Sequence, residues 1–173
     1  GNAGTGMRLM AGFLAGAGIA AKLIGDASLS RRPMGRIRDP LAQMGADLVL
    51  EGEGNRPPIR IRPARLKGIR YPLPVASAQV KSCILLASLF ADGDTEVVEP
   101  RETRDHTERL MRAMGLPIRV EGLTIRMPGL NGAFHPPGRA WRVPSDFSSA
   151  AFWIVAAAAR PGAALELEGV GLN

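Results

Sequence analysis

The sequence predicts an α/β fold assembled from a duplicated helix–strand unit. Two observations carry this prediction: segments rich in alanine and leucine alternate with short strands, and the pattern returns after about 70 residues. Hydrophobic residues make up 46% of the 173-residue chain, which is enough to bury a core. A repeat of this length indicates a whole supersecondary unit and not a short solenoid motif.

The unit begins with a helix that follows a cluster of small or polar residues and ends at a glycine before a short strand. This plan occurs in residues 2–26, 77–99 and 145–168, with strands expected at 95–99 and 164–168. The single cysteine, Cys83, falls in the apolar run of the second of these helices. We therefore interpret it as a core residue and not as a nucleophile.

A second helix and two strands complete the unit. The helix leads to Met44-Gly45 in one copy and to Met114-Gly115 in the other, 70 positions later. Alternating polarity after each Met-Gly pair predicts strands at 46–51 and 59–63, and again at 118–121 and 124–127.

Individual residues give expected details of these second helices. Pro33 is expected in the first turn of the earlier helix. Asp105, or Thr103 just before it, is expected to cap the later helix, with Glu108 three residues after Asp105 completing a capping box.

The charge of the chain favours a small anionic ligand over nucleic acid. The net charge is +6, but the basic residues are dispersed, and only Phe 5, Trp 2 and Tyr 1 are available for base stacking. One cysteine excludes an internal disulfide and a cysteine-based zinc cluster, which fits a cytoplasmic protein. The apolar stretch at 7–21 is too short to span a bilayer, and no signal peptide is expected, so no membrane partner is expected.

The first eight residues, GNAGTGMR, predict an anion site. Three glycines and a threonine leave backbone N–H groups uncovered just before a helix, where the positive end of the helix dipole also favours an anion. No Gly-Lys-Ser/Thr follows, so the stretch is not a Walker A loop. Since no Met and no strand precede it, we expect the chain to be a fragment.

Five blocks of sequence together resemble one family, 5-enolpyruvylshikimate-3-phosphate synthase, also called 3-phosphoshikimate 1-carboxyvinyltransferase. In family order they are GNAGTGMR at 1–8, GDASLSRRPMG at 25–35, ASAQVKS at 76–82, TRDHTE at 103–108 and PSDFSSAA at 144–151. The second, third and fourth blocks look most like the glyphosate-tolerant bacterial branch. Gly4 stands where some tolerant members carry alanine, so the resemblance implies room for glyphosate in the complete parent.

The resemblance implies an inverse α/β prism, the enolpyruvyl transferase fold, built from repeated βαβαββ units and only partly present here. Residues 1–143 would form two of the three units of one globe, and residues 144–173 the first helix and strand of the second globe. The family transfers the enolpyruvyl group of phosphoenolpyruvate to the 5-hydroxyl of shikimate 3-phosphate and releases phosphate. The resemblance implies no cofactor, no metal and a monomeric parent.

By the same resemblance, the phosphoenolpyruvate site comprises Asn2, Gly4, Arg32 and Gln79, and the shikimate 3-phosphate site comprises Ser77, Gln79 and Arg104. Plainer interpretations stay open beside these roles: a turn glycine at Gly4, a surface arginine at Arg32, and a helix N-cap at Ser77. His106 is expected at a ligand edge or a cap.

No residue of this chain is expected to be catalytic, so the fragment alone is expected to be inactive. Asp146, beside Ser148 and Ser149, is interpreted as a helix cap and not as an acid or base. Lys81 follows Gln79 within a turn but has a weaker claim, since a solvated lysine explains it equally. The apolar helix at 151–159 is expected to expose Phe152 and Trp153.

Two other functions compete. One is the sister enolpyruvyl transferase that acts on UDP-N-acetylglucosamine, which shares the fold but uses a loop cysteine and lacks the blocks at 25–35 and 103–108. The other is a non-catalytic α/β repeat domain that binds anions or RNA, which the scarcity of aromatic residues disfavours.

Overall fold

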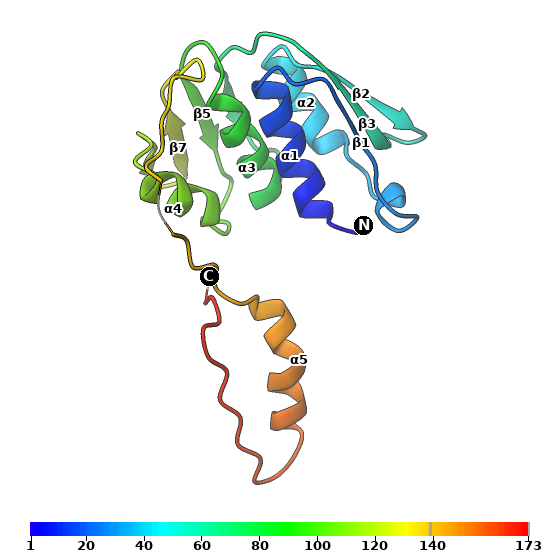
Figure 1. Cartoon of the computed structure of the whole chain (residues 1–173), viewed down its shortest axis with the longest axis vertical. Helices are drawn as coiled ribbons and strands as arrows, with labels where there is room; N and C mark the ends of the chain where they lie inside the picture. The colour runs from blue at the N-terminus through cyan, green and yellow to red at the C-terminus, as the bar shows by residue number, and fades with distance from the viewer. Residues whose placement is uncertain (139, 173) are drawn as a thin grey trace. The chain divides into compact units, whose positions relative to one another are not determined.

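The structure is a computed structural model that describes residues 1–138 and 140–172. Residue 173, the last of the segment 144–173 that was expected to begin the second globe, therefore lies outside the described residues. It divides into two compact units, Gly1–Pro136 and Pro137–Asn173 (Figure 1). The first unit contains the two copies of the repeat, and the second contains one helix and a returning chain.

The first copy of the repeat consists of α1 (Gly4–Gly16), β1 (Ala21–Leu23), α2 (Gly35–Gln43), β2 (Asp47–Gly52) and β3 (Arg56–Arg62), with a 3₁₀ turn at Leu29–Arg31. Its strands form an antiparallel sheet of order β1-β3-β2. The β2–β3 hairpin occupies the two stretches of alternating polarity after Met44-Gly45, so both predicted strands are confirmed.

The second copy follows the same plan after a leading strand. It consists of β4 (Arg70–Pro72), α3 (Ala78–Ser88), β5 (Thr95–Val98), α4 (His106–Ala113), β6 (Arg119–Glu121) and β7 (Thr124–Met127). β4 pairs parallel to β5, and the sheet order is β4-β5-β7-β6. Because β1-β3-β2 recurs as β5-β7-β6, the duplication predicted from the 70-residue period is confirmed, and the second copy is a complete βαβαββ unit.

The helices of the first unit lie between its two sheets (Figure 1). Ile59 and Ile61 of β3 face the helices on one side, and Val97 and Ile125 of β5 and β7 do so on the other. Because successive side chains of a strand point to opposite faces of the sheet, the charged neighbours of these residues lie on the outer faces. Sheets outside and helices inside are the arrangement that an inverse α/β prism requires.

Ion pairs lie on the outer faces of both sheets. Glu51 of β2 pairs with Lys22 at 2.8 Å and with Arg60. On the other sheet, Glu96 of β5 accepts from Arg70 and Arg126 at 2.7 and 2.8 Å. In each sheet, these ion pairs lie on the face that points away from the core.

The helices α1 and α3 run parallel in close contact, with glycines where they touch. A Cβ on Gly12 would lie 2.1 Å from the carbonyl oxygen of Cys83, and one on Gly16 would lie 2.8 Å from that of Ala87. Cys83 is fully buried, as its apolar setting predicted. Since Gln79, earlier in α3, contacts Thr5, earlier in α1, both helices have their N-termini at the same end.

Two expected helix starts are wrong in detail. α2 begins at Gly35 and not at Pro33: Arg32 is extended (ψ 133°), and Met34 occupies the N-cap position. Asp105 occupies the N-cap position of α4 without a side-chain capping bond, and its carboxylate accepts instead from Arg109. Glu108 does not reach back to complete a capping box, because it points inward to Lys81.

Among the described residues of the second unit, one helix is present, α5 (Phe147–Ala158). Asp146 caps it, accepting from the backbone of Ser149 at 2.8 Å, as predicted. The strand expected at 164–168 is absent, and a single bridge, Ser145 to Val170, ties the returning chain to the start of the helix. Phe152 is 80% and Trp153 64% exposed, so the predicted apolar face is confirmed.

None of the described helices combines the length and the apolar character that crossing a membrane requires.

Candidate functional site

A cavity of about 350 Å³ in the first unit collects half of the six predicted ligand-binding residues. Its walls come from the start of α1, the start of α3 and the chain entering α4; the lining residues are Thr5, Leu9, Ser77, Ala78, Gln79, Ser82, Arg104 and His106. Three of them, Ser77, Gln79 and Arg104, are those predicted for the shikimate 3-phosphate site. Residues up to 101 positions apart in the chain, Thr5 and His106, are thus brought to one cavity.

Three helix N-termini meet at this cavity. Thr5 lies in the first turn of α1, Ala78 begins α3 and His106 begins α4. The first turn of a helix has backbone N–H groups without intrahelical acceptors and carries the positive end of the dipole. The cavity is therefore electropositive and suited to an anion, even before its arginine is counted.

Gln79 is fixed by hydrogen bonds at both ends of its amide. Its Nε2 donates to Thr5 Oγ1 at 2.7 Å, and its Oε1 accepts from Arg8 Nη1 at 2.7 Å. The side chain therefore joins α3 to α1 and cannot rotate without losing both bonds. Gln79 thus lies at the wall of the cavity and contacts an arginine of the first copy.

Beside Gln79, three arginines converge. Arg8 also donates to the carbonyl of Pro33 at 3.1 Å. Partial burial lowers the pKa of Arg8, with repulsion from Arg32 and Arg36 as further causes. Among the described residues, Arg32 and Arg36 have no carboxylate partner within salt-bridge distance. A cationic cluster without its own counter-charge is suited to a phosphate or carboxylate ligand.

Gly4 lies against this cluster. It is buried at the start of α1, and a Cβ there would come within 2.9 Å of Arg32 Nη1. The glycine therefore permits Arg32 to approach the N-terminus of α1. Asn2 lies two residues earlier, exposed, with its backbone oxygen accepting from the N–H of Gly4, and it does not line the 350 Å³ cavity.

Ser77 has the structural role that was left open for it. It is the N-cap of α3, and its hydroxyl accepts from the backbone of Val80 at 3.4 Å. Ser77 also lines the cavity. The two roles are compatible, because a helix N-terminus is also where an anion binds.

Sequence reasoning missed two features of this region. Thr5 and the two contacts of Arg8 were not singled out, although residues three apart on a helix share a face. The plainer interpretation of Lys81, a solvated lysine, is wrong: the residue is 1% exposed and pairs with Glu99 and Glu108. Nothing in the local sequence identifies partners 18 and 27 positions away.

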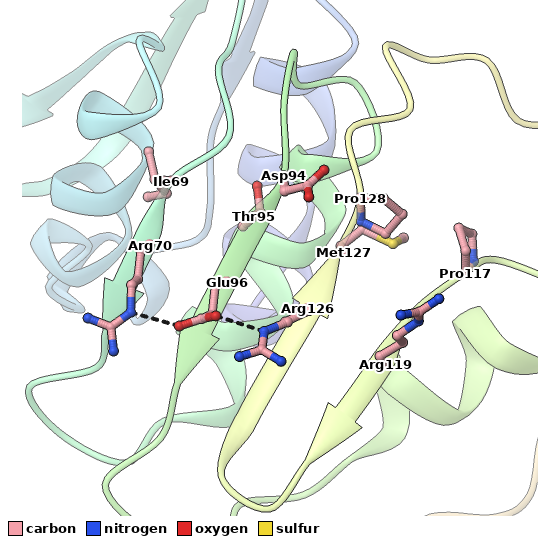
Figure 2. Close-up of a pocket in the computed structure, with 10 residues that line it drawn as sticks. All are labelled: Ile69, Arg70, Asp94, Thr95, Glu96, Pro117, Arg119, Arg126, Met127 and Pro128. Carbon is pink, nitrogen blue, oxygen red and sulfur yellow. Dashed lines mark hydrogen bonds and ion pairs between the residues drawn. The ribbon is translucent and has the colours of Figure 1, made fainter.

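A second cavity, of about 380 Å³, lies on the outer face of the β4–β7 sheet and is a poorer anion site (Figure 2). Two of its three arginines are already paired: Glu96 bridges Arg70 and Arg126, and Arg126 also contacts Glu121 at 2.5 Å. These hydrogen bonds, from Arg126 first and then Arg70, lower the pKa of Glu96 and keep it charged. The cavity at the helix N-termini has no carboxylate among its described lining residues and is therefore the better anion site.

Comparison with known proteins shows what the chain is similar to. The sequence profile of EPSP synthase (3-phosphoshikimate 1-carboxyvinyltransferase) matches residues 1–173. The 3-phosphoshikimate 1-carboxyvinyltransferases of Thermus thermophilus and Akkermansia muciniphila are 58% and 56% identical over 100% of this chain, which covers 40% and 39% of their lengths. An EPSP synthase structure from Acinetobacter baumannii superimposes with a TM-score of 0.84, at 51% identity, over 99% of this chain and 38% of that one.

The chain thus spans about 40% of the length of these relatives. Sequence profile, identity and fold agree over its whole length. The chain belongs to the EPSP synthase family.

Proposed function

We propose that this chain forms the substrate-binding part of an enzyme that transfers the enolpyruvyl group of phosphoenolpyruvate to the 5-hydroxyl of shikimate 3-phosphate and releases phosphate. The observation that carries the proposal is the meeting of three helix N-termini with Ser77, Gln79 and Arg104 at one cavity. Family membership supplies the reaction, and the cavity supplies the chemistry that a phosphorylated substrate needs.

In this proposal, shikimate 3-phosphate occupies the 350 Å³ cavity. Arg104 and the N-terminus of α3 bind its phosphate, and the Ser77 hydroxyl and Gln79 amide contact its hydroxyl groups. Phosphoenolpyruvate lies on the other side of Gln79, against Arg32 and the backbone at Asn2 and Gly4. Gln79, held by Thr5 and Arg8, then separates the two substrates and fixes their spacing.

The chemistry itself requires groups beyond these. The reaction needs an acid to protonate the methylene carbon of phosphoenolpyruvate and a base for the attacking hydroxyl. Among the described residues that line the cavity, only His106 carries an imidazole or a carboxyl group. We therefore propose that the 173-residue chain binds substrate without turnover, in line with the 40% of relatives' length that it spans.

The proposal extends to domain organisation and setting. Residues 1–143 form two βαβαββ units of one globe, and residues 144–173 begin the second. The enzyme is monomeric and cytoplasmic and takes no nucleic acid, membrane or cofactor as partner. The exposed apolar face of α5 supports this division, since a helix of that composition packs against further structure.

Calorimetric titration of the chain with shikimate 3-phosphate tests the proposal. We expect binding, and Arg104→Ala is expected to weaken it by about tenfold or more, since a charge-assisted hydrogen bond contributes about 1.5–3 kcal/mol. Arg126→Ala, which removes an arginine from the other cavity, is the matched control and should leave the affinity unchanged. Preference for UDP-N-acetylglucosamine or RNA, or a larger effect of Arg126→Ala, would contradict the assignment.

A further inference from the structure

A lysine is buried behind the proposed site, between two carboxylates. The Nζ atom of Lys81 lies 2.9 Å from Glu99 Oε2 and 2.6 Å from Glu108 Oε1, and all three side chains are almost fully buried. Lys81 belongs to α3, Glu99 directly follows β5, and Glu108 lies in the first turn of α4. A buried ammonium group requires such partners, so this charged cluster holds the three elements together.

The chain between the two carboxylates carries Arg104 and is anchored on both sides of it. On one side, the Thr103 hydroxyl donates to Glu99, the carboxylate that also holds Lys81. On the other side, the Thr107 hydroxyl donates to Ser82 Oγ of α3 at 2.6 Å, next to the Glu108–Lys81 pair. Residues 103–108 are therefore fastened to α3 at both ends.

Arg104 itself has no such support. Its guanidinium makes no hydrogen bond or ion pair with any described residue, and it is exposed at the cavity wall. Its place beside Ser77 and Gln79 is consequently set by the backbone that carries it. That backbone is held by Lys81 and its neighbours.

We propose that Lys81 is a positioning residue for Arg104. Its ammonium bridges Glu99 and Glu108, closes the 99–108 segment against α3, and so places the Arg104 guanidinium at the cavity. This inference rests on the proposed function, because the placement of Arg104 matters for catalysis only if the cavity binds shikimate 3-phosphate. Without the ammonium, two carboxylates would face one buried point with no counter-charge, and Glu108 Oε2 already has no hydrogen-bond partner among the described residues. Their repulsion would open the segment.

Lys81→Met tests the proposal, because methionine keeps the length of the stem and removes the charge. Hydrogen exchange of the 173-residue chain needs no ligand: we expect the hydrogen-bonded amides of α4, from Arg109 to Met114, to exchange about tenfold faster or more, while β2 and β3 keep their protection. Lys22→Met, which removes an exposed lysine from an ion pair with Glu51, is the matched control and should leave the α4 amides unchanged. Unchanged exchange of the α4 amides in Lys81→Met would overturn the proposal, whatever the chain binds.

Calorimetry with shikimate 3-phosphate then shows whether the effect passes through Arg104. We expect Lys81→Met to weaken binding about tenfold in the original chain but less than about twofold in Arg104→Ala, as coupled residues do in a double-mutant cycle. Equal losses in both backgrounds would show general destabilisation and refute the positioning role. If the original chain binds no shikimate 3-phosphate, the proposed function fails, while the exchange result still decides whether Lys81 holds the segment.

If Lys81→Met does not fold, a neutral variant replaces it. Lys81→Met combined with Glu99→Gln and Glu108→Gln leaves no unpaired buried charge but still lacks the ionic bridge. The same faster exchange and the same dependence on Arg104 are expected. Original exchange rates and affinity in this variant would overturn the proposal.

Discussion

Replacing Gly12 by alanine should destabilise the chain, although alanine is the better helix former. An alanine inside a helix gains about 1 kcal/mol over glycine. At Gly12, however, the new Cβ would lie 2.1 Å from the Cys83 carbonyl oxygen, about 1 Å closer than tight packing allows. Both atoms are fixed to helix backbones, so α1 and α3 would have to separate.

Overpacking of this kind costs typically about 1–3 kcal/mol, and contact with a backbone atom places Gly12 at the upper end. Subtracting the gain in helix propensity leaves a net loss of about 2 kcal/mol. Urea denaturation followed by far-UV circular dichroism would measure it as a lower midpoint with little change in slope.

Gly6→Ala is the matched control in the same helix. Its Cβ would meet nothing nearer than Ala3 Cβ at 3.4 Å, so the full gain of about 0.5–1 kcal/mol is expected and the midpoint should rise. The two substitutions are chemically identical and differ only in what the new methyl group meets. Midpoints that move in the same direction would refute the reasoning that glycine is required by the α1–α3 contact.

Three further predictions concern the site and the core. In a full-length enzyme that carries this chain, Gly4→Ala places a methyl group 2.9 Å from Arg32 Nη1 and should raise the glyphosate concentration for half-inhibition about tenfold or more; an unchanged value would exclude a glyphosate site there. Arg8→Lys keeps the charge but loses the fork that holds Gln79 and Pro33, so titration should show shikimate 3-phosphate binding about tenfold weaker, and unchanged affinity would mean that charge alone suffices. Burial raises the pKa of Cys83 to about 12 from 9.0, so the unfolded thiol ionises first; stability is intact below pH 9 and falls as the pH rises from 9 to 12. Urea denaturation of Cys83→Ala should show a shallower loss across that range, and an identical loss would show that the thiol does not contribute.

The repeat and most of its elements were predictable because their signals are local. Each Met-Gly pair is followed by alternating polarity, and this alone predicts the hairpins β2–β3 and β6–β7. The caps Ser77 and Asp146 were likewise predictable, since a small polar residue before an apolar run suits the first turn. The strand expected at 164–168 failed because a strand also needs a partner, and local alternation says nothing about one.

The site was predictable only in part. The blocks of sequence that resemble the family contain Ser77, Gln79 and Arg104, and the fold brings these three together. The burial of Lys81 was not predictable, because a lysine in the first turns of a helix suits solvent as well as a buried pair. Whether it turns inward depends on Glu99 and Glu108, and on how α4 packs against α3.

The paired charges on the outer sheet faces affect how the molecule behaves in solution. A second sheet could stack on the β4–β7 face only by stripping water from Glu96 and its two arginines, which is unfavourable. The same holds for Glu51 with Lys22 and Arg60 on the other sheet. These two faces therefore resist colloidal association at low ionic strength, and added salt, which screens exposed charges, should weaken that resistance.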